Sequence, residues 1–193
     1  MTTIRRKTPW LTQMVRATFL LFLSIQSSMG QDIASATFVQ SKDVFSDISS
    51  PGGIWVNSDG TAIFLSGTSF STEDVVYTYD LSVAYDLSTA VRSVAKTFTM
   101  GNSDFTITPH DLVFKPDGSM FFVVGSYFDL NTFDQGDSLY SFSLSTPFDV
   151  STAVLANRAR FDISAEEDFT SGVELNNDGS KIFIIGKTND QVV

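Results

Sequence analysis

Three stretches of the chain repeat one another: IWVNSDGTAIFLSG (54–67), LVFKPDGSMFFVVG (112–125) and VELNNDGSKIFIIG (173–186). In each of them an Asp-Gly pair separates two apolar runs, and a second glycine, at the same spacing from the pair, closes the second run. A second block also recurs, as DVVYTYDLSVAYDLSTAV (74–91) and DSLYSFSLSTPFDVSTAV (137–154). The Asp-Gly pairs begin at positions 59, 117 and 178, so the repeat is roughly 60 residues long, which suits one four-stranded unit with its loops.

Each repeat is predicted to form four short antiparallel strands in an all-β fold. The first strand is the apolar run before the Asp-Gly pair, and the second is the nearly continuous apolar run after it, as expected for a strand covered on both faces. The Asp-Gly pair itself is typical of a hairpin turn with glycine at positive φ. In the third strand Tyr77, Tyr79 and Leu81 alternate with polar residues, and the fourth strand contains Phe98 or Phe161.

The first strands and their turns read SPGGIWVNSDG, TPHDLVFKPDG and TSGVELNNDG. The third strands read VVYTY and SLYSF. These segments resemble the repeats of the YVTN and lactonase-like β-propeller family, in which a P-x-G-[apolar]-x-[apolar]-x-P-D-G core precedes a V-Y-x-Y strand. The resemblance spans residues 36–193 and implies that each repeat is one propeller blade. It implies no activity, because one fold carries many unrelated functions.

The three repeats occupy about residues 44–100, 101–163 and 164–193. They predict a partial β-propeller of about two and a half blades, whereas a ring needs about four to eight blades to remove its exposed edges. ATFVQS (36–41) resembles an outer strand that closes a ring, with Phe38 in the place of Phe98. We therefore interpret residues 31–193 as a fragment of a longer ring. The alternative is a ring of two copies joined head to tail, and open blade edges predict self-association.

Residues 1–30 have the pattern of a secretory signal peptide. Four bases and no acid accompany a short apolar run at 17–25, and Ser28 and Gly30 precede a cleavage position before Gln31. A membrane anchor is the alternative, but nine residues of helix reach only about 14 Å against a hydrocarbon core of roughly 30 Å. The sequence thus predicts a mature chain that is secreted, periplasmic or on the cell surface, without membrane insertion.

The mature chain is strongly acidic. Without the four bases of the signal peptide, eight Lys and Arg residues face 22 Asp and Glu residues, a net charge of −14. Such a surface repels nucleic acid and suits cations, basic partners or neutral sugars. The chain has no cysteine, so neither disulfides nor thiolate metal sites contribute.

His110 is the only histidine of the chain, and it precedes Asp111 at the start of the second repeat's first strand. The other repeats place small residues at these positions: Gly52 and Gly53, and Ser171 and Gly172. In a propeller this end of the strand lies at the mouth of the central channel. One interpretation is a ligand or an acid–base group at the channel rim, and the other is a histidine that bonds loop backbone.

Acidic residues concentrate in the loops that are expected to share a face with the start of the first strands. These acids are Asp43, Asp47, Glu73, Asp74, Asp104, Asp111, Asp129, Asp134, Asp137, Glu166, Glu167, Asp168 and Asp190. The longest loop, GSYFDLNTFDQGD (125–137), makes Tyr127, Asp129, Asp134 and Asp137 candidates for binding a glycan, a protein or a cation such as Ca²⁺. The alternative is an acidic surface that keeps a secreted protein soluble.

The sequence favours an extracellular binding or scaffold module, with the acidic loop face as its contact surface, over an enzyme. The alternative is a propeller-type hydrolase or lactonase, which would hold a divalent metal in the channel through oxygen ligands from several blades. Asp111 is the one carboxylate that the three first strands offer at their starts.

Overall fold

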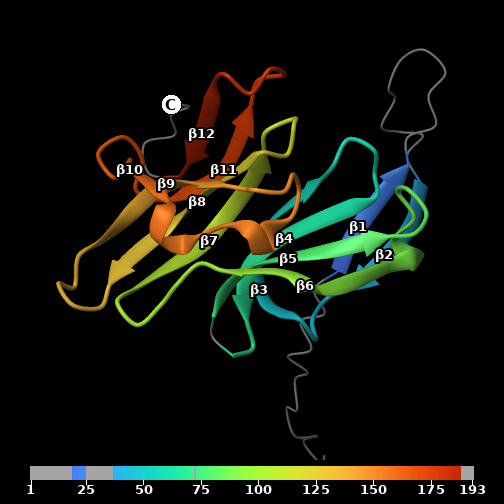
Figure 1. Ribbon diagram of the computed structural model, residues 1–193, viewed down its shortest axis with the longest axis horizontal. Coiled ribbons are helices and arrows are strands. Elements are labelled where there is room, and N and C mark those ends of the chain that lie inside the picture. The colour runs from blue at the N-terminus through green and yellow to red at the C-terminus, as the bar shows by residue number, and fades with distance from the viewer. Residues whose placement is uncertain (1–18, 25–36, 72, 188–193) are drawn as a thin grey trace, which may run out of the picture.

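The computed structural model describes residues 19–24, 37–71 and 73–187, which form an all-β structure of antiparallel sheets (Figure 1). Sheet 1 and sheet 2 are four-stranded meanders, and sheet 3 has two strands. Sheet 1 consists of β3 (Ile48–Val56), β4 (Ala62–Ser69), β5 (Asp74–Leu81) and β6 (Ala90–Thr99). Sheet 2 consists of β7 (Phe105–Phe114), β8 (Met120–Asp129), β9 (Gln135–Ser143) and β10 (Ala159–Asp162), and sheet 3 of β11 (Thr170–Leu175) and β12 (Ile182–Gly186). Within the described ranges, no helix has the length and hydrophobicity of a membrane span.

A separate two-stranded sheet pairs β1 (Phe19–Ser24) with β2 (Thr37–Asp43). β2 covers most of the segment that the sequence predicts as the outer strand that closes a ring, and its partner in the structure is β1. β1 falls within the predicted signal peptide. The rest of that peptide, and residues 188–193, where the third strand of the third repeat is expected, lie outside the described residues.

The first strands are longer than the apolar runs that predict them. β3 begins at Ile48 rather than at residue 54, and β7 begins at Phe105 rather than at residue 112. In both strands the pairing register shifts next to a proline, Pro51 in β3 and Pro109 in β7. A proline has no N–H to donate to the ladder, so it lies at an irregularity beyond which the pairing resumes.

The Asp-Gly turns have the geometry that the sequence predicts. Gly60, Gly118 and Gly179 have φ angles of 72°, 69° and 68°, in the left-handed region that favours glycine. The aspartate before each glycine caps the turn; Asp117, for example, accepts hydrogen bonds from the backbone N–H and the hydroxyl of Ser119. These turns join the first and second strands of each repeat.

The second repeated block forms a capped 3₁₀ helix in both copies, a feature absent from the sequence prediction. Asp86 and Asp149 each accept a hydrogen bond from the N–H two residues later, at the start of η2 (Leu87–Thr89) and η3 (Val150–Thr152). The helix η4 (Leu155–Asn157) follows η3. The aromatic residue before each cap has positive φ, and its ring lies against the turn glycine: Tyr85 against Gly60, and Phe148 against Gly118.

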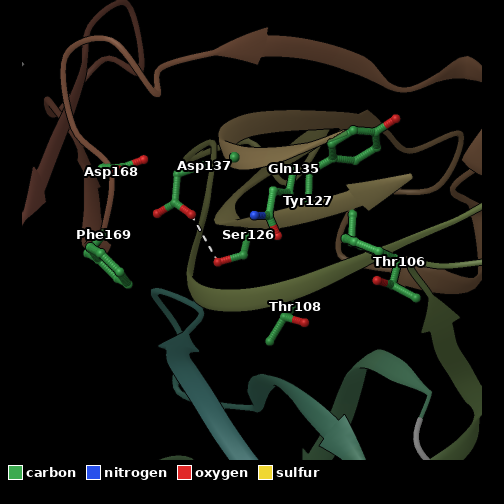
Figure 2. Close-up of a pocket in the computed structure, with 10 residues that line it drawn as sticks. Thr106, Thr108, Ser126, Tyr127, Gln135, Asp137, Asp168 and Phe169 are labelled. Carbon is green, nitrogen blue, oxygen red and sulfur yellow. Dashed lines mark hydrogen bonds between the residues drawn. The ribbon is translucent and has the colours of Figure 1, made fainter. Parts of the chain in front are cut away.

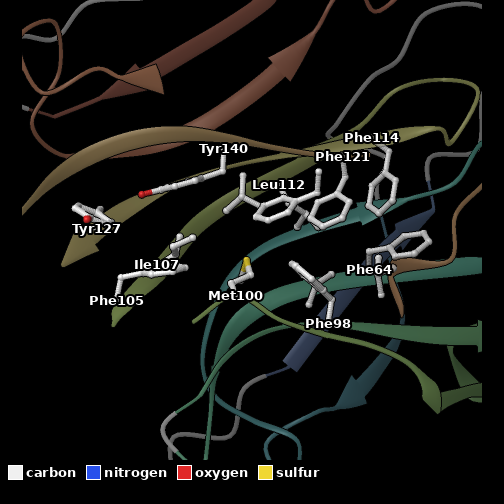
Figure 3. Close-up of a cluster of buried hydrophobic side chains, with 14 of the residues drawn as sticks. Phe64, Phe98, Met100, Phe105, Ile107, Leu112, Phe114, Phe121, Tyr127 and Tyr140 are labelled. Atoms are coloured by element: carbon white, nitrogen blue, oxygen red, sulfur yellow. The ribbon is translucent and has the colours of Figure 1, made fainter. Parts of the chain in front are cut away.

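The seam between sheets 1 and 2 is an aromatic core (Figure 3). The ring of Phe114 lies 4.9 Å from that of Trp55 and 4.3 Å from that of Phe64, measured between centroids. Phe121 and Phe142 continue the cluster within sheet 2, with centroids 4.9 Å apart. Each such pair contributes about 0.5–1.5 kcal/mol beyond the burial of its area, so the aromatic contacts stabilise this seam.

The first strands of the three repeats lie next to one another. β7 contacts β3 and β4 of sheet 1 on one side and β11 of sheet 3 on the other. The sheets therefore follow one another in chain order, each packed through its first strand on the preceding sheet (Figure 1). In the part of the chain that the structure describes, the sheets do not close into a ring.

Candidate functional site

Four polar side chains meet where the third repeat packs on sheet 2. His110 lies in β7, Ser126 in β8 and Asp137 in β9, and Thr170 is the first residue of β11. Ser126 and Asp137 are paired across the β8–β9 ladder, so their side chains lie on the same face of sheet 2. His110 and Asp137 are candidates from the sequence, whereas no sequence pattern identified Ser126 or Thr170.

Asp137 is buried and is the centre of this network. Its Oδ2 accepts hydrogen bonds from the Thr170 backbone N–H at 2.6 Å and from the Thr170 hydroxyl at 2.7 Å. Its Oδ1 accepts a hydrogen bond from the Ser126 hydroxyl at 2.9 Å. The carboxylate thus joins sheet 2 to the start of β11, and it is buried in a strand rather than placed in the loop that the sequence predicts.

His110 bridges the same two hydroxyl groups. Its Nδ1 lies 3.0 Å from Thr170 Oγ1, and its Nε2 lies 3.2 Å from Ser126 Oγ. The distance from Nδ1 to Asp137 Oδ2 is 3.7 Å, and the imidazole is partly exposed. His110 therefore bonds side chains of its own sheet and of sheet 3, rather than the loop backbone, and it also lines a pocket.

Asp111 links the first strands of the second and third repeats. Its Oδ1 accepts a hydrogen bond from its neighbour's N–H, and its Oδ2 accepts one from the N–H of Val173 in β11 at 2.9 Å. Burial raises the pKa of this carboxyl above the usual range. A Cβ at Gly53 would lie 2.5 Å from Asp111 Oδ1, so the glycine at the equivalent position of the first repeat makes room for the carboxylate.

Two open pockets flank the network, and together they form a surface that we call the rim groove. The first pocket, of about 370 Å³, lies on the side of Ser126, and the second, of about 390 Å³, lies on the side of His110. Thr108 and Phe169 line both pockets, so the pockets adjoin, and Phe169 is 62% exposed. Figure 2 shows the first pocket, with Phe169 and Asp168 near the bond between Ser126 and Asp137. The polar residues around the two pockets also include Thr106, Gln135, Ser50, Thr68, Ser171 and Lys187.

The predicted loop 125–137 is mostly strand, which corrects the sequence analysis. β8 continues to Asp129 and β9 begins at Gln135, so only residues 130–134 connect them. The ladder places Tyr127 opposite Gly136, and Tyr127 is 9% exposed. The guanidinium of Arg160 lies 3.9 Å from the centroid of the Tyr127 ring, and this contact covers the ring. Tyr127 therefore contributes a wall of the first pocket rather than an exposed contact.

Asp129 stabilises the β8–β9 turn. Its Oδ1 accepts hydrogen bonds from the N–H groups of Asn131 and Thr132, and its Oδ2 accepts one from the Tyr127 hydroxyl. The Thr132 N–H is the main cause that holds the pKa of this carboxyl below its usual value. Asp134 is exposed and follows the same turn. Among the described residues, no three His, Cys, Asp or Glu side chains are grouped so that they could hold a metal ion.

The acidic residues of the predicted loop face differ in their exposure and in their partners. Asp74, Asp137 and Glu167 are buried, and Asp47 forms an ion pair with Arg92 at 3.2 Å. Glu73, Asp104, Asp134, Glu166 and Asp168 are exposed, as expected for a contact surface or a solvated one. Asp190 lies outside the described residues.

A repeated pair of residues could have identified the buried network in the sequence. Thr68 and Asp74 of the first repeat occupy the positions of Ser126 and Asp137, and the Thr68 hydroxyl donates to Asp74 at 2.8 Å. A hydroxyl and a carboxylate that recur together at facing strand ends indicate a structural hydrogen bond. No comparable signal in the sequence identifies Phe169.

Neither the known protein-family models nor the curated proteins contain a significant match to this chain.

Proposed function

We propose that the chain forms consecutive blades of an extracellular β-propeller that serves as a binding module, and that the rim groove binds a glycan. The order of the sheets supports the propeller, because each first strand packs on the preceding sheet. The predicted signal peptide supports an extracellular location. The acidic composition supports a neutral ligand over an anionic one.

The observation that carries the proposal is the position of Phe169. An exposed aromatic ring stands between two polar pockets and lines both of them. A sugar ring presents an apolar C–H face and a rim of hydroxyl groups. It can therefore place the apolar face on the phenyl ring and its hydroxyl groups in the pockets on either side.

The groups around Phe169 supply both donors and acceptors. The first pocket offers the amide of Gln135 and the carboxylate of Asp168, and the second offers the hydroxyl of Ser171 and the ammonium of Lys187. Beneath them, the bonds of Asp137 hold the groove in one geometry. A binding surface ordered in advance loses less conformational entropy when the ligand binds.

The metal-dependent hydrolase of the sequence analysis gains less support from the site. Its chemistry needs oxygen ligands that converge from several first strands. Asp111 is the carboxylate at these positions in the described repeats, and both of its oxygens already accept backbone N–H groups.

The test is a screen of the purified chain against immobilised neutral glycans, followed by calorimetry with each glycan that binds. Phe169→Ala should weaken binding by at least about tenfold, which corresponds to about 1.4 kcal/mol. Phe161→Ala is the matched control, because Phe161 is 64% exposed and lines neither pocket. An absence of glycan binding, or an equal loss in both variants, would overturn the proposal.

A further inference from the structure

One face of β3, which carries Ile54 and Val56 and which we call its outer face, exposes side chains whose equivalents in the other repeats are buried. Ile54, Leu112 and Val173 occupy the same position in the three first strands. Leu112 is 2% exposed in the core shared with sheet 1, and Val173 is buried against sheet 2, but Ile54 is 49% exposed. Val56 likewise is exposed where its equivalent, Phe114, is buried. The outer face of β3 therefore has the character of a surface that packs on a preceding sheet.

The outer face of β12 is exposed in the complementary way. Phe64, Phe122 and Phe183 are equivalent in the second strands. Phe64 is fully buried under β7, and Phe122 packs in the cluster shared with sheet 3, but Phe183 is 44% exposed. Ile185 beside it is also exposed, and a pocket of about 330 Å³ lies in this face. The outer face of β12 thus has the character of a surface that receives a following first strand.

The two exposed faces match the contacts that already exist inside the molecule. In the seam between sheets 1 and 2, Phe114 packs 4.3 Å from Phe64, measured between ring centroids. Val56 stands at the position of Phe114, and Phe183 stands at the position of Phe64. The same packing therefore brings Val56 of one molecule against Phe183 of another, with an apolar residue on each side.

We propose that the β11–β12 face of one molecule binds the β3 face of a second copy of this chain, head to tail. Each chain has three first strands, so two copies together have six. This number lies within the range of about four to eight blades in a closed propeller. The contact is heterologous, so each molecule uses two different surfaces. The proposal concerns the ends of the sheet array and does not depend on the ligand of the rim groove.

The first experiment measures the molar mass of the full chain by light scattering over a range of concentrations. We expect a dimer, and we expect Ile54→Glu and Phe183→Glu each to raise the concentration for half-association by at least about tenfold, because each buries a charge in an apolar seam. Val94→Glu is the control, because Val94 is a 78% exposed apolar residue of β6 that neither face contains. A monomer at every concentration, or equal effects of all three variants, would overturn the proposal.

The second experiment tests the orientation and uses the absence of native cysteine. Ile54→Cys and Phe183→Cys are made in separate chains, mixed, and treated with a short bis-maleimide. The head-to-tail contact predicts cross-linked dimers that join position 54 to position 183. Cross-links that join 54 to 54 or 183 to 183 instead, or a mixture that stays uncross-linked, would contradict it.

Discussion

His110 Nδ1 lies 3.0 Å from Thr170 Oγ1, across the seam between sheets 2 and 3. Thr170 also donates both its N–H and its hydroxyl to Asp137. This seam therefore has polar bonds in addition to an apolar cluster that includes Val124, Val173 and Ile184, whereas the seam between sheets 1 and 2 is held by aromatic packing. In the second repeat Pro109 stands at the position of Thr170 and has no N–H, so Asp74 of the first repeat cannot form the equivalent bond.

Replacing Asp137 should destabilise the protein. Asp137→Ala leaves the buried Thr170 N–H and two hydroxyl groups without their acceptor, so the free energy of unfolding should fall by at least about 2 kcal/mol. Asp134→Ala, at an exposed position, should change it by less than about 0.5 kcal/mol. Urea unfolding followed by circular dichroism measures both. Similar values for the two variants would show that the network contributes little.

Replacing Asp74 should stabilise the protein at neutral pH, in contrast to replacing Asp137. Burial raises the pKa of Asp74 above the ordinary value of 3.8, so the folded state binds the proton more tightly than the unfolded chain. The stability that the protonated Asp74 carboxyl contributes is then fully present below about pH 4 and is lost as the pH rises through the pKa of the folded state. Asp74→Asn should raise the melting temperature at pH 7, and the gain should shrink towards pH 4. Asp104→Asn, at an exposed position, controls for the loss of one negative charge. A gain for Asp74→Asn that is equal at both pH values would refute the explanation.

The turn glycines offer a matched pair of substitutions. Gly118→Ala should cost about 1–2 kcal/mol, because φ is 69° and the new Cβ would meet the ring of Phe148. Gly179→Ala has nearly the same φ, but its nearest neighbour is Pro116 Cδ at 3.2 Å, so it should cost only about 1 kcal/mol. Thermal melts of both variants measure the difference. A larger loss for Gly179→Ala would mean that the ring contact is unimportant.

Calcium should leave the stability unchanged. The two carboxylate oxygens of Asp129 already accept hydrogen bonds, and Asp137 is buried under Thr170. A ligand that bound only the folded state would raise the melting temperature by mass action. We expect millimolar Ca²⁺ to give no shift at low ionic strength. A rise in melting temperature that disappears in the double variant Asp129→Asn, Asp134→Asn would instead support the cation site that the sequence suggests.

The repeated strands and turns could be predicted because their signals are local. The apolar runs around the Asp-Gly pairs, and the glycines with positive φ, depend on residues within one hairpin. The four-stranded meanders of sheets 1 and 2 confirm this part of the prediction. The strand limits were less accurate, because residues 125–129 contain serine, glycine and aspartate and have the composition of a loop, although the ladder continues through them.

The candidate site could be predicted only in part. His110 and Asp111 stood out because the other repeats have small residues at their positions. Their actual partners, Thr170 and Val173, lie about 60 residues away in the next repeat, and no local pattern identifies such a contact. The exposure of Phe169 depends likewise on how sheets 2 and 3 pack.

The most direct test of the binding proposal is chemical-shift mapping of the isotope-labelled chain during titration with a glycan identified by the screen. Binding at the rim groove predicts shift changes at Thr108, Phe169 and Ser171, with no change at Phe161 of β10. Changes confined to other surfaces, or no changes at saturating glycan, would contradict the assignment of the rim groove as the binding site.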